Sequence, residues 1–170
     1  MSANRLAALA HYVIWKCEPS DLGAVKLNKI LWFSDLEHYR RTGQTITGAT
    51  TYTKLQHGPV PKGILRALSA LEAESKIARA TENYYGRPKT MFLALARPDL
   101  AAFDADEIAT VDMIAELICR HTAASISRLS HDVLWDETEI GTDMSIGAGS
   151  VLPGEATAED LEWARAAFAD

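Results

Sequence analysis

The chain has 170 residues, 48% of them hydrophobic, and a formal net charge of −6. This length favours a single domain, and this hydrophobic content supports a core without metals or disulfides. The net negative charge opposes nonspecific binding to nucleic acid, unless a local basic patch overrides it. Because the chain has neither a signal-peptide pattern nor an apolar run of about 18 residues, we expect a soluble cytoplasmic protein that does not enter a membrane.

Two helices are predicted at the start of the chain. Over about residues 4–17 apolar side chains recur at helical spacing, which is typical of an amphipathic helix. A second helix should run from about Val25 to Arg40. Its stretch from Ile30 to Phe33 is apolar at four consecutive positions, and a helix that is apolar on several faces is buried from several sides. We therefore expect the second helix to be the central and most buried element.

A short strand and a third helix should follow. Residues 48–55 alternate in character and are rich in β-forming side chains, which predicts a strand. Gly58-Pro59 should form a turn, because glycine and proline adopt the backbone angles that turns require. Pro61 is expected in the first turn of the third helix, where its missing N–H is harmless.

Further along the chain, residues 76–80 and 90–95 should pair as a hairpin whose tip lies within residues 83–88. Asp104 is a good N-cap for a fourth helix, since its carboxylate can accept a hydrogen bond from a free backbone N–H. A fifth helix is expected over residues 126–134, where apolar residues again recur at helical spacing.

The remaining features are a long loop and two cysteines. Residues 136–156 are acidic, then rich in glycine and serine, and show no periodicity, so we expect a loop followed by a short last helix from about residue 157. Cys17 and Cys119 are isolated in the sequence, and we expect them to be buried, reduced thiols rather than a disulfide.

These elements together predict an α+β fold. We expect a mainly helical single domain of about five or six helices with a small antiparallel sheet of about three strands. Residues 1–136 would form this domain, and residues 137–170 a C-terminal extension that packs on it.

Three segments of the sequence carry a resemblance to a known family. They are a Lys-Leu-x-Lys helix, a Gly-Pro-Val turn and a tryptophan that ends a helical segment. Their residues are Lys26, Leu27, Lys29, Leu31, Phe33, Gly58, Pro59, Val60 and Trp135. In this order and spacing they resemble the Panacea domain family, also called SocA-like antitoxin domains and formerly a domain of unknown function. The resemblance implies the antitoxin of a toxin–antitoxin system, which neutralises a cognate toxin by direct protein contact and performs no catalysis.

Two of these motif residues have structural interpretations of their own. Lys29 lies among apolar residues, and a buried amine is normally paired, so we expect an ion pair with Asp35 or Glu37. A direct contact of Lys29 with a partner is the alternative. Trp135 follows an apolar stripe and is expected to anchor the core, because an indole buries a large area.

The sequence offers no arrangement of residues typical of an enzyme. No histidine or cysteine pair has metal-ligand spacing. Ser130-His131-Asp132 cannot form a relay, because neighbours on a helix point about 100° apart. We therefore expect no catalytic residue, no metal and no cofactor.

Six residues are candidates for binding a partner. Exposed aromatic and basic side chains on strands and turns dominate many protein interfaces. The candidates are Tyr52, His57, Lys62, Tyr84, Tyr85 and Arg87. We expect Tyr52 and His57 to lie near the three hairpin residues of this set, because the strand ending at Leu55 could add to the hairpin over residues 76–95. The acidic chain would favour a basic toxin, and a homodimer is a further option.

A winged-helix-like, DNA-binding transcriptional regulator is the alternative function. Helix, strand, helix and hairpin follow one another across residues 25–95 in the order of a winged helix. Residues 61–75 would be the recognition helix, and the hairpin would be a wing whose Arg79, Arg87 and Lys89 contact phosphates of operator DNA. The recognition helix, however, carries few side chains that could read bases.

Overall fold

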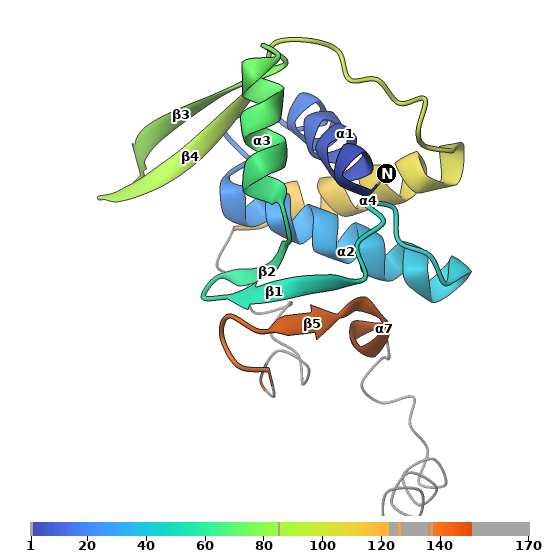
Figure 1. Ribbon diagram of the computed structural model, residues 1–170. Helices are drawn as coiled ribbons and strands as arrows, with labels where there is room; N and C mark the ends of the chain where they lie inside the picture. The colour runs from blue at the N-terminus through green and yellow to red at the C-terminus, as the bar shows by residue number, and fades with distance from the viewer. Residues whose placement is uncertain (1, 85, 123–125, 127–135, 137, 151–170) are drawn as a thin grey trace, which may run out of the picture.

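The computed structural model describes residues 2–84, 86–122, 126, 136 and 138–150. The described residues form five helices and five strands, which confirms the predicted α+β class (Figure 1). The helices are α1 (Ser2–Lys16), α2 (Ala24–Thr42), α3 (Ile64–Ala73), α4 (Ala105–Cys119) and α7 (Ile146–Gly149). The strands are β1 (Thr51–Leu55), β2 (Gly58–Pro61), β3 (Ile77–Tyr84), β4 (Arg87–Ala94) and β5 (Asp143–Ser145).

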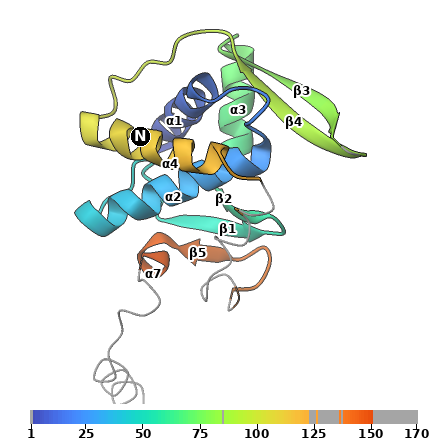
Figure 2. The same cartoon turned by 180° about the vertical axis from the view of Figure 1, so that it is seen from behind.

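Helix α2 is the centre of the molecule. It contacts α1 and α4 on one side and β2 and α7 on the other, and both views show it running between these layers (Figures 1 and 2). Leu27, Ile30 and Leu31 are buried, and Phe33 is half-buried. The expectation of a buried central helix is therefore confirmed. Among the described residues no helix is both long and apolar enough to cross a membrane.

A three-stranded antiparallel sheet with the order β2-β1-β5 covers one side of α2. Two predictions in this region were wrong. The segment that begins Gly58-Pro59 is a strand rather than a turn, and Pro61 pairs with Tyr52 at the end of that strand instead of opening a helix. Strand β2 lies at the edge of the sheet, where a proline without an N–H costs no ladder hydrogen bond. Helix α3 starts only after Gly63.

Strands β3 and β4 form a second sheet of their own. Each strand has eight residues, so the hairpin is longer than predicted, although its position is correct. The expectation that β1 would add to this hairpin was wrong, because β1 pairs with β2 and β5 instead. The hairpin packs on α1 and α3 through its buried Ile77 and Phe92.

Helix α4 starts directly after Asp104, the N-cap residue that was predicted from the sequence. The Glu107 backbone N–H donates to Asp104 Oδ1 at 2.8 Å, and the Asp104 N–H donates to Glu107 Oε2 at 3.0 Å. This reciprocal capping box satisfies two N–H groups that a helix start leaves free. The predicted fifth helix, Trp135 and the predicted last helix from residue 157 lie outside the described residues.

Candidate partner-binding surface

The helix motif and the Gly-Pro-Val motif meet in the interior of the protein. Lys29 of α2 is fully buried and lies directly beneath Gly58 of β2. A Cβ atom placed on Gly58 would be 2.6 Å from Lys29 Nζ, and the φ angle of Gly58 is +139°, so only glycine suits this position. Burial lowers the pKa of Lys29 to about 8. The two motifs are therefore one structural unit.

The acids predicted to pair with Lys29 are engaged elsewhere. The buried carboxylate of Asp35 accepts hydrogen bonds from the Thr47 N–H at 2.9 Å, from the Thr47 hydroxyl and from the Tyr52 hydroxyl at 2.7 Å. Glu37 faces the basic end of α2 and lies 3.6 Å from Arg41 Nε. The structure therefore does not support the predicted ion pair of Lys29 with either acid.

Tyr52 is a core residue, so its prediction as an exposed contact was wrong. It lies in β1, the central strand of its sheet, and its side chain points inward. Its ring packs edge-on against Trp32, with 5.0 Å between the ring centroids. Burial and the neighbouring Asp35 carboxylate raise the pKa of Tyr52 well above its usual value. The Tyr52 hydroxyl therefore serves the internal network around Asp35 rather than a partner.

The other candidates lie on two hairpins that belong to separate sheets. His57 is exposed in the turn between β1 and β2. Lys62 is exposed just after β2, and its Nζ lies 2.5 Å from Asp143 Oδ2. Tyr84 and Arg87 pair through their backbones at the tip of the β3–β4 hairpin. The side chains of these two residues, and all of Tyr85, lie outside the part that the structure describes.

The β3–β4 hairpin carries an exposed apolar face that the sequence interpretation missed. Residues opposite each other in an antiparallel pair share a face, and Ile77 and Phe92 define the face that packs on the helices. The other face carries Ala78, Ala80, Met91, Leu93 and Leu95, here called the outer hairpin face, and it continues toward the hairpin tip with the opposed pair Glu82 and Lys89. Leu93 is 52% exposed and Leu95 54% exposed. In Figure 2 the hairpin lies in front of α3, so this face is on the side away from that helix.

A signal for this face was present in the sequence. Residues 91–96 read Met-Phe-Leu-Ala-Leu-Ala, an unbroken apolar run. Such a run is typical of a strand that is covered on both faces. Among the described residues only one face of β4 packs on the core, while Leu93 and Leu95 on the other face are more than half exposed.

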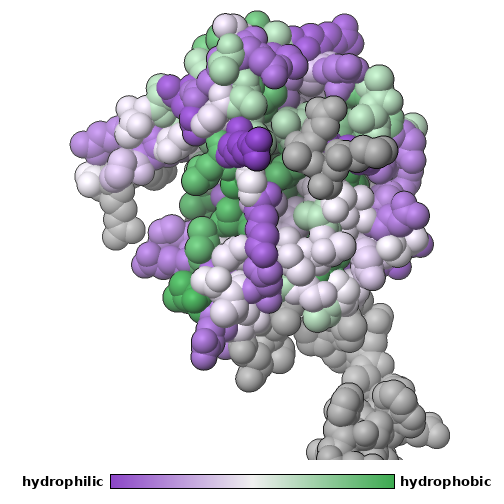
Figure 3. Space-filling model, viewed as in Figure 1, coloured by the Kyte–Doolittle hydropathy of each residue, from purple (hydrophilic) through white to green (hydrophobic). Residues whose placement is uncertain are grey.

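A second apolar surface is visible in the space-filling view (Figure 3). Figure 3 shows a green band left of centre, between the β3–β4 hairpin and the β1–β2 hairpin. The exposed apolar residues on the elements that border this region are Leu65 of α3, at 72%, and Leu55 of β1, at 43%. Leu55 lies two residues before His57 in the sequence, and each of the two apolar surfaces has two large side chains that are exposed.

The basic residues expected to contact DNA are largely used within the protein. The guanidinium of Arg79 pairs with Glu72 of α3 and holds the pKa of that carboxyl below its usual value. Lys89 Nζ donates to the Ser20 carbonyl at 2.6 Å, and Lys62, near the start of the segment expected to be the recognition helix, pairs with Asp143. These contacts do not favour the winged-helix alternative.

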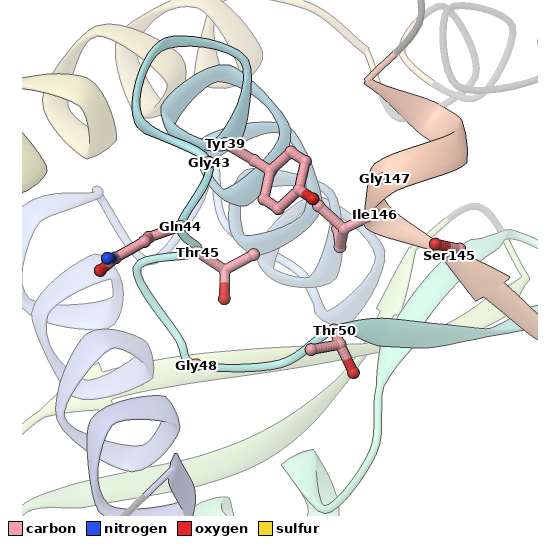
Figure 4. A pocket seen from close by; sticks show the side chains of 9 residues that line it. All are labelled: Tyr39, Gly43, Gln44, Thr45, Gly48, Thr50, Ser145, Ile146 and Gly147. Atoms are coloured by element: carbon pink, nitrogen blue, oxygen red, sulfur yellow. The ribbon is translucent and has the colours of Figure 1, made fainter.

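A cleft of about 350 Å³ lies between the end of α2 and the β5–α7 segment. Figure 4 shows the Tyr39 hydroxyl pointing toward Ile146 and Gly147 across this cleft. Its nine lining residues are Tyr39, Gly43, Gln44, Thr45, Gly48, Thr50, Ser145, Ile146 and Gly147. They include no carboxylate, imidazole or thiol, so the cleft offers no nucleophile paired with a base. Among the described residues, no group of three or more potential metal ligands is placed to hold an ion.

Comparison with known proteins gives one match. No curated protein and no solved structure matches the chain. The model of one family, described as antitoxin SocA-like, Panacea domain, matches residues 27–136. This range covers more than half of the 170 residues and includes Lys29 and Gly58, at which the two motifs meet. The chain therefore belongs to the SocA-like antitoxin family with the Panacea domain.

Proposed function

We propose that this protein is an antitoxin that neutralises a cognate toxin by direct binding, and that the outer hairpin face is the centre of its toxin-binding surface. Membership of the antitoxin family supports the general role. The position of the toxin-binding surface is inferred from Leu93 and Leu95. Both side chains are more than half exposed, and they lie on one face of a sheet whose other face packs on the core.

The outer hairpin face has the composition of an interface rather than of a solvated strand. A two-stranded sheet with one free side normally places polar residues on that side. Here the part of that side nearest the helices carries alanine, leucine and methionine, and the opposed charged residues Glu82 and Lys89 follow only toward the hairpin tip. Burying a leucine completely stabilises a complex by about 1.5–3 kcal/mol, so covering the exposed half of each leucine contributes about 1 kcal/mol.

The hairpin tip extends the same surface. Tyr84, Tyr85 and Arg87 stay candidates for contact, because tyrosine and arginine are enriched among interface residues with large binding contributions. An apolar patch next to an aromatic and basic tip would give the toxin a hydrophobic centre with a polar rim. The net charge of −6 favours a toxin with a basic surface, since opposite potentials speed encounter.

The experiment uses two matched pairs of substitutions. Leu93→Ser with Leu95→Ser removes the centre of the outer hairpin face. Met113→Ser with Leu117→Ser removes two residues of α4 that are 52% and 51% exposed, so the control pair matches the test pair in exposure. The probe is the product of a short neighbouring gene whose expression is toxic in the absence of this protein.

The test pair should weaken toxin binding at least tenfold by titration calorimetry, which corresponds to about 1.4 kcal/mol. It should also abolish rescue of growth. The control pair should bind within about twofold of wild type, because α4 lies outside the proposed toxin-binding surface and residues away from the centre of an interface contribute little. Both pairs should keep the wild-type melting temperature within about 2 °C, since surface changes are usually small. Wild-type affinity in the test pair with loss in the control pair would move the interface to α4.

A further inference from the structure

Two thiols that are far apart in the sequence meet at one end of the helical layer. Cys17 follows α1 directly and Cys119 is the last residue of α4, 102 positions later. Their Sγ atoms are 3.4 Å apart, and both residues are free cysteines. Both are half-buried and line a cleft of about 500 Å³, so small molecules can reach them. The two cysteines, which are isolated in the sequence, therefore meet in space, and they are free thiols as expected rather than a disulfide.

The surroundings make the two thiols unequal. The hydrogen bond that Cys119 shares with Cys17, and the positive charge of Lys26, hold the pKa of Cys119 below its usual value. Lys26 Nζ also donates to the Cys119 carbonyl at 3.3 Å, which fixes the ammonium group close by. The hydrogen bond with Cys119 and burial raise the pKa of Cys17. Because the thiolate is the reactive form, Cys119 is the nucleophile of the pair.

We propose that Cys17 and Cys119 are an oxidation site that takes a small uncharged peroxide and closes to an intramolecular disulfide. The Cys119 thiolate attacks one peroxide oxygen, the O–O bond breaks and hydroxide leaves, which produces a sulfenic acid on Cys119. Cys17 then attacks Cys119 Sγ, the S–O bond breaks, and the hydroxyl leaves as water with the Cys17 proton. In total, two thiols and one hydrogen peroxide give one disulfide and two water molecules.

The geometry favours closure over other fates of the sulfenic acid. A disulfide needs a sulfur separation of about 2.05 Å, so the two Sγ atoms must approach by roughly 1.4 Å from their present contact. Cys17 is already the nearest thiol to Cys119, since the chain has only two cysteines. The resolving step is therefore intramolecular and needs no second chain.

The charges around the cleft select the oxidant. Four carboxylates and one ammonium line it together with the thiols, and these are Glu18, Asp21, Asp112, Glu116 and Lys16. This negative rim repels anionic oxidants such as glutathione disulfide and admits neutral ones. Hydrogen peroxide is both small and uncharged, so it fits the cleft.

The test begins with the wild-type chain, treated with hydrogen peroxide after removal of reductant. We expect loss of both free thiols, a mass lower by about 2 Da and a monomer on non-reducing gels, because each disulfide removes two hydrogens. The melting temperature should rise by about 5 °C or more over the reduced form, since the bond closes a loop of roughly 100 residues in the unfolded chain. A disulfide-linked dimer, or a gain of oxygen with no loss of two hydrogens, would overturn the proposal.

Single variants test the order of the steps. In Cys17→Ser, Cys119 should react with peroxide and stop at a sulfenic acid that dimedone labels. In Cys119→Ser, Cys17 should react at least ten times more slowly. Equal rates in the two variants would overturn the assignment of Cys119 as the nucleophile.

Two disulfide oxidants that differ in charge test the role of the carboxylates around the cleft. Neutral hydroxyethyl disulfide should react faster with the wild-type thiols than glutathione disulfide does, and the reverse order would overturn that role. If a variant does not fold, the intact mass of the oxidised wild-type protein still shows whether the disulfide forms.

Discussion

Gly58 and Lys29 are the residue pair on which the family motifs depend. The glycine belongs to an edge strand and the lysine to the central helix, and the two are in direct contact. Spacing along the sequence could predict the helix and the special backbone at glycine separately. It could not predict that the Gly-Pro-Val motif lies directly over Lys29, because that contact depends on how β2 packs against α2.

Gly58→Ala should destabilise the protein by about 2–4 kcal/mol in urea unfolding, from backbone strain together with overpacking. The new Cβ would lie 2.6 Å from Lys29 Nζ and 3.3 Å from its Cε, and the buried lysine has little room to move. Gly63→Ala is the matched control, because Gly63 also has a positive φ, +84°, but no atom within 4 Å of an added Cβ. The control should cost about 1 kcal/mol from backbone strain alone. Equal losses in both variants would mean that contact with Lys29 costs nothing.

The buried amine of Lys29 predicts a pH dependence of stability. Its pKa is lowered to about 8 in the folded state, while an exposed lysine titrates near 10.5. Between these values the unfolded chain binds more protons than the folded chain, so the free energy of unfolding rises with pH. Relative to Lys29→Met, which lacks the titrating group, the wild type should gain about 2 kcal/mol between pH 7 and pH 10. A difference between the two proteins that stays constant over this range would contradict the prediction.

At the scale of elements, helices were easier to predict than strands. The apolar spacing of α1 and α2 and the cap of α4 are local signals, and each identified its helix. Strand β2 contains two prolines and a glycine, which are poor β-formers, and it exists because β1 offers a partner next to it. Strand β5 has only three residues, which is too short for a period-two pattern to be recognised.

The cap of α4 gives a prediction at this scale. Asp104→Ala removes the acceptor for the Glu107 N–H and should reduce the free energy of unfolding by about 1 kcal/mol. Asp104→Asn keeps a side-chain oxygen in the same place, so it should stay within a few tenths of a kcal/mol of wild type. Chemical denaturation of the three proteins at one pH makes the comparison. If asparagine cost as much as alanine, the charge of Asp104 near the helix dipole would matter more than its hydrogen bond.

At the scale of the whole molecule, contacts between distant segments were the part that the sequence could not predict. Pattern and propensity describe a segment and its near neighbours, whereas β1 pairs with a strand about 90 residues later instead of with the next hairpin. The same limit hid the contact of the two cysteines and the burial of Tyr52. The outer hairpin face is different, since its apolar run was visible in the sequence and only its exposure required the structure.

The boundary of the domain is a question at this scale too. The family match ends at residue 136, as does the domain predicted from the sequence. Yet β5 completes the sheet beyond that point, and Met144 and Ile146 are both buried. Gly149 of α7 lies so close to Trp32 that an added Cβ would be 3.2 Å from the indole. We infer that the folding unit includes residues 138–150 as well as the family match.

Two truncated chains test this inference. A chain that ends at Asp136 lacks β5 and α7, and a chain that ends at Ser150 retains both. The shorter chain loses two buried apolar side chains, each of which contributes about 1.5–3 kcal/mol, so its free energy of unfolding should be lower by at least about 3 kcal/mol. For a chain of this size that difference lowers the melting temperature by about 6–12 °C, which calorimetry on the two proteins can measure. Met144→Ala in the full chain should reproduce part of the loss, because it removes one of the two side chains without shortening the protein. Equal melting temperatures for the two truncated chains would instead make residues 1–136 self-sufficient, and β5 would then be an addition to a sheet that is stable without it.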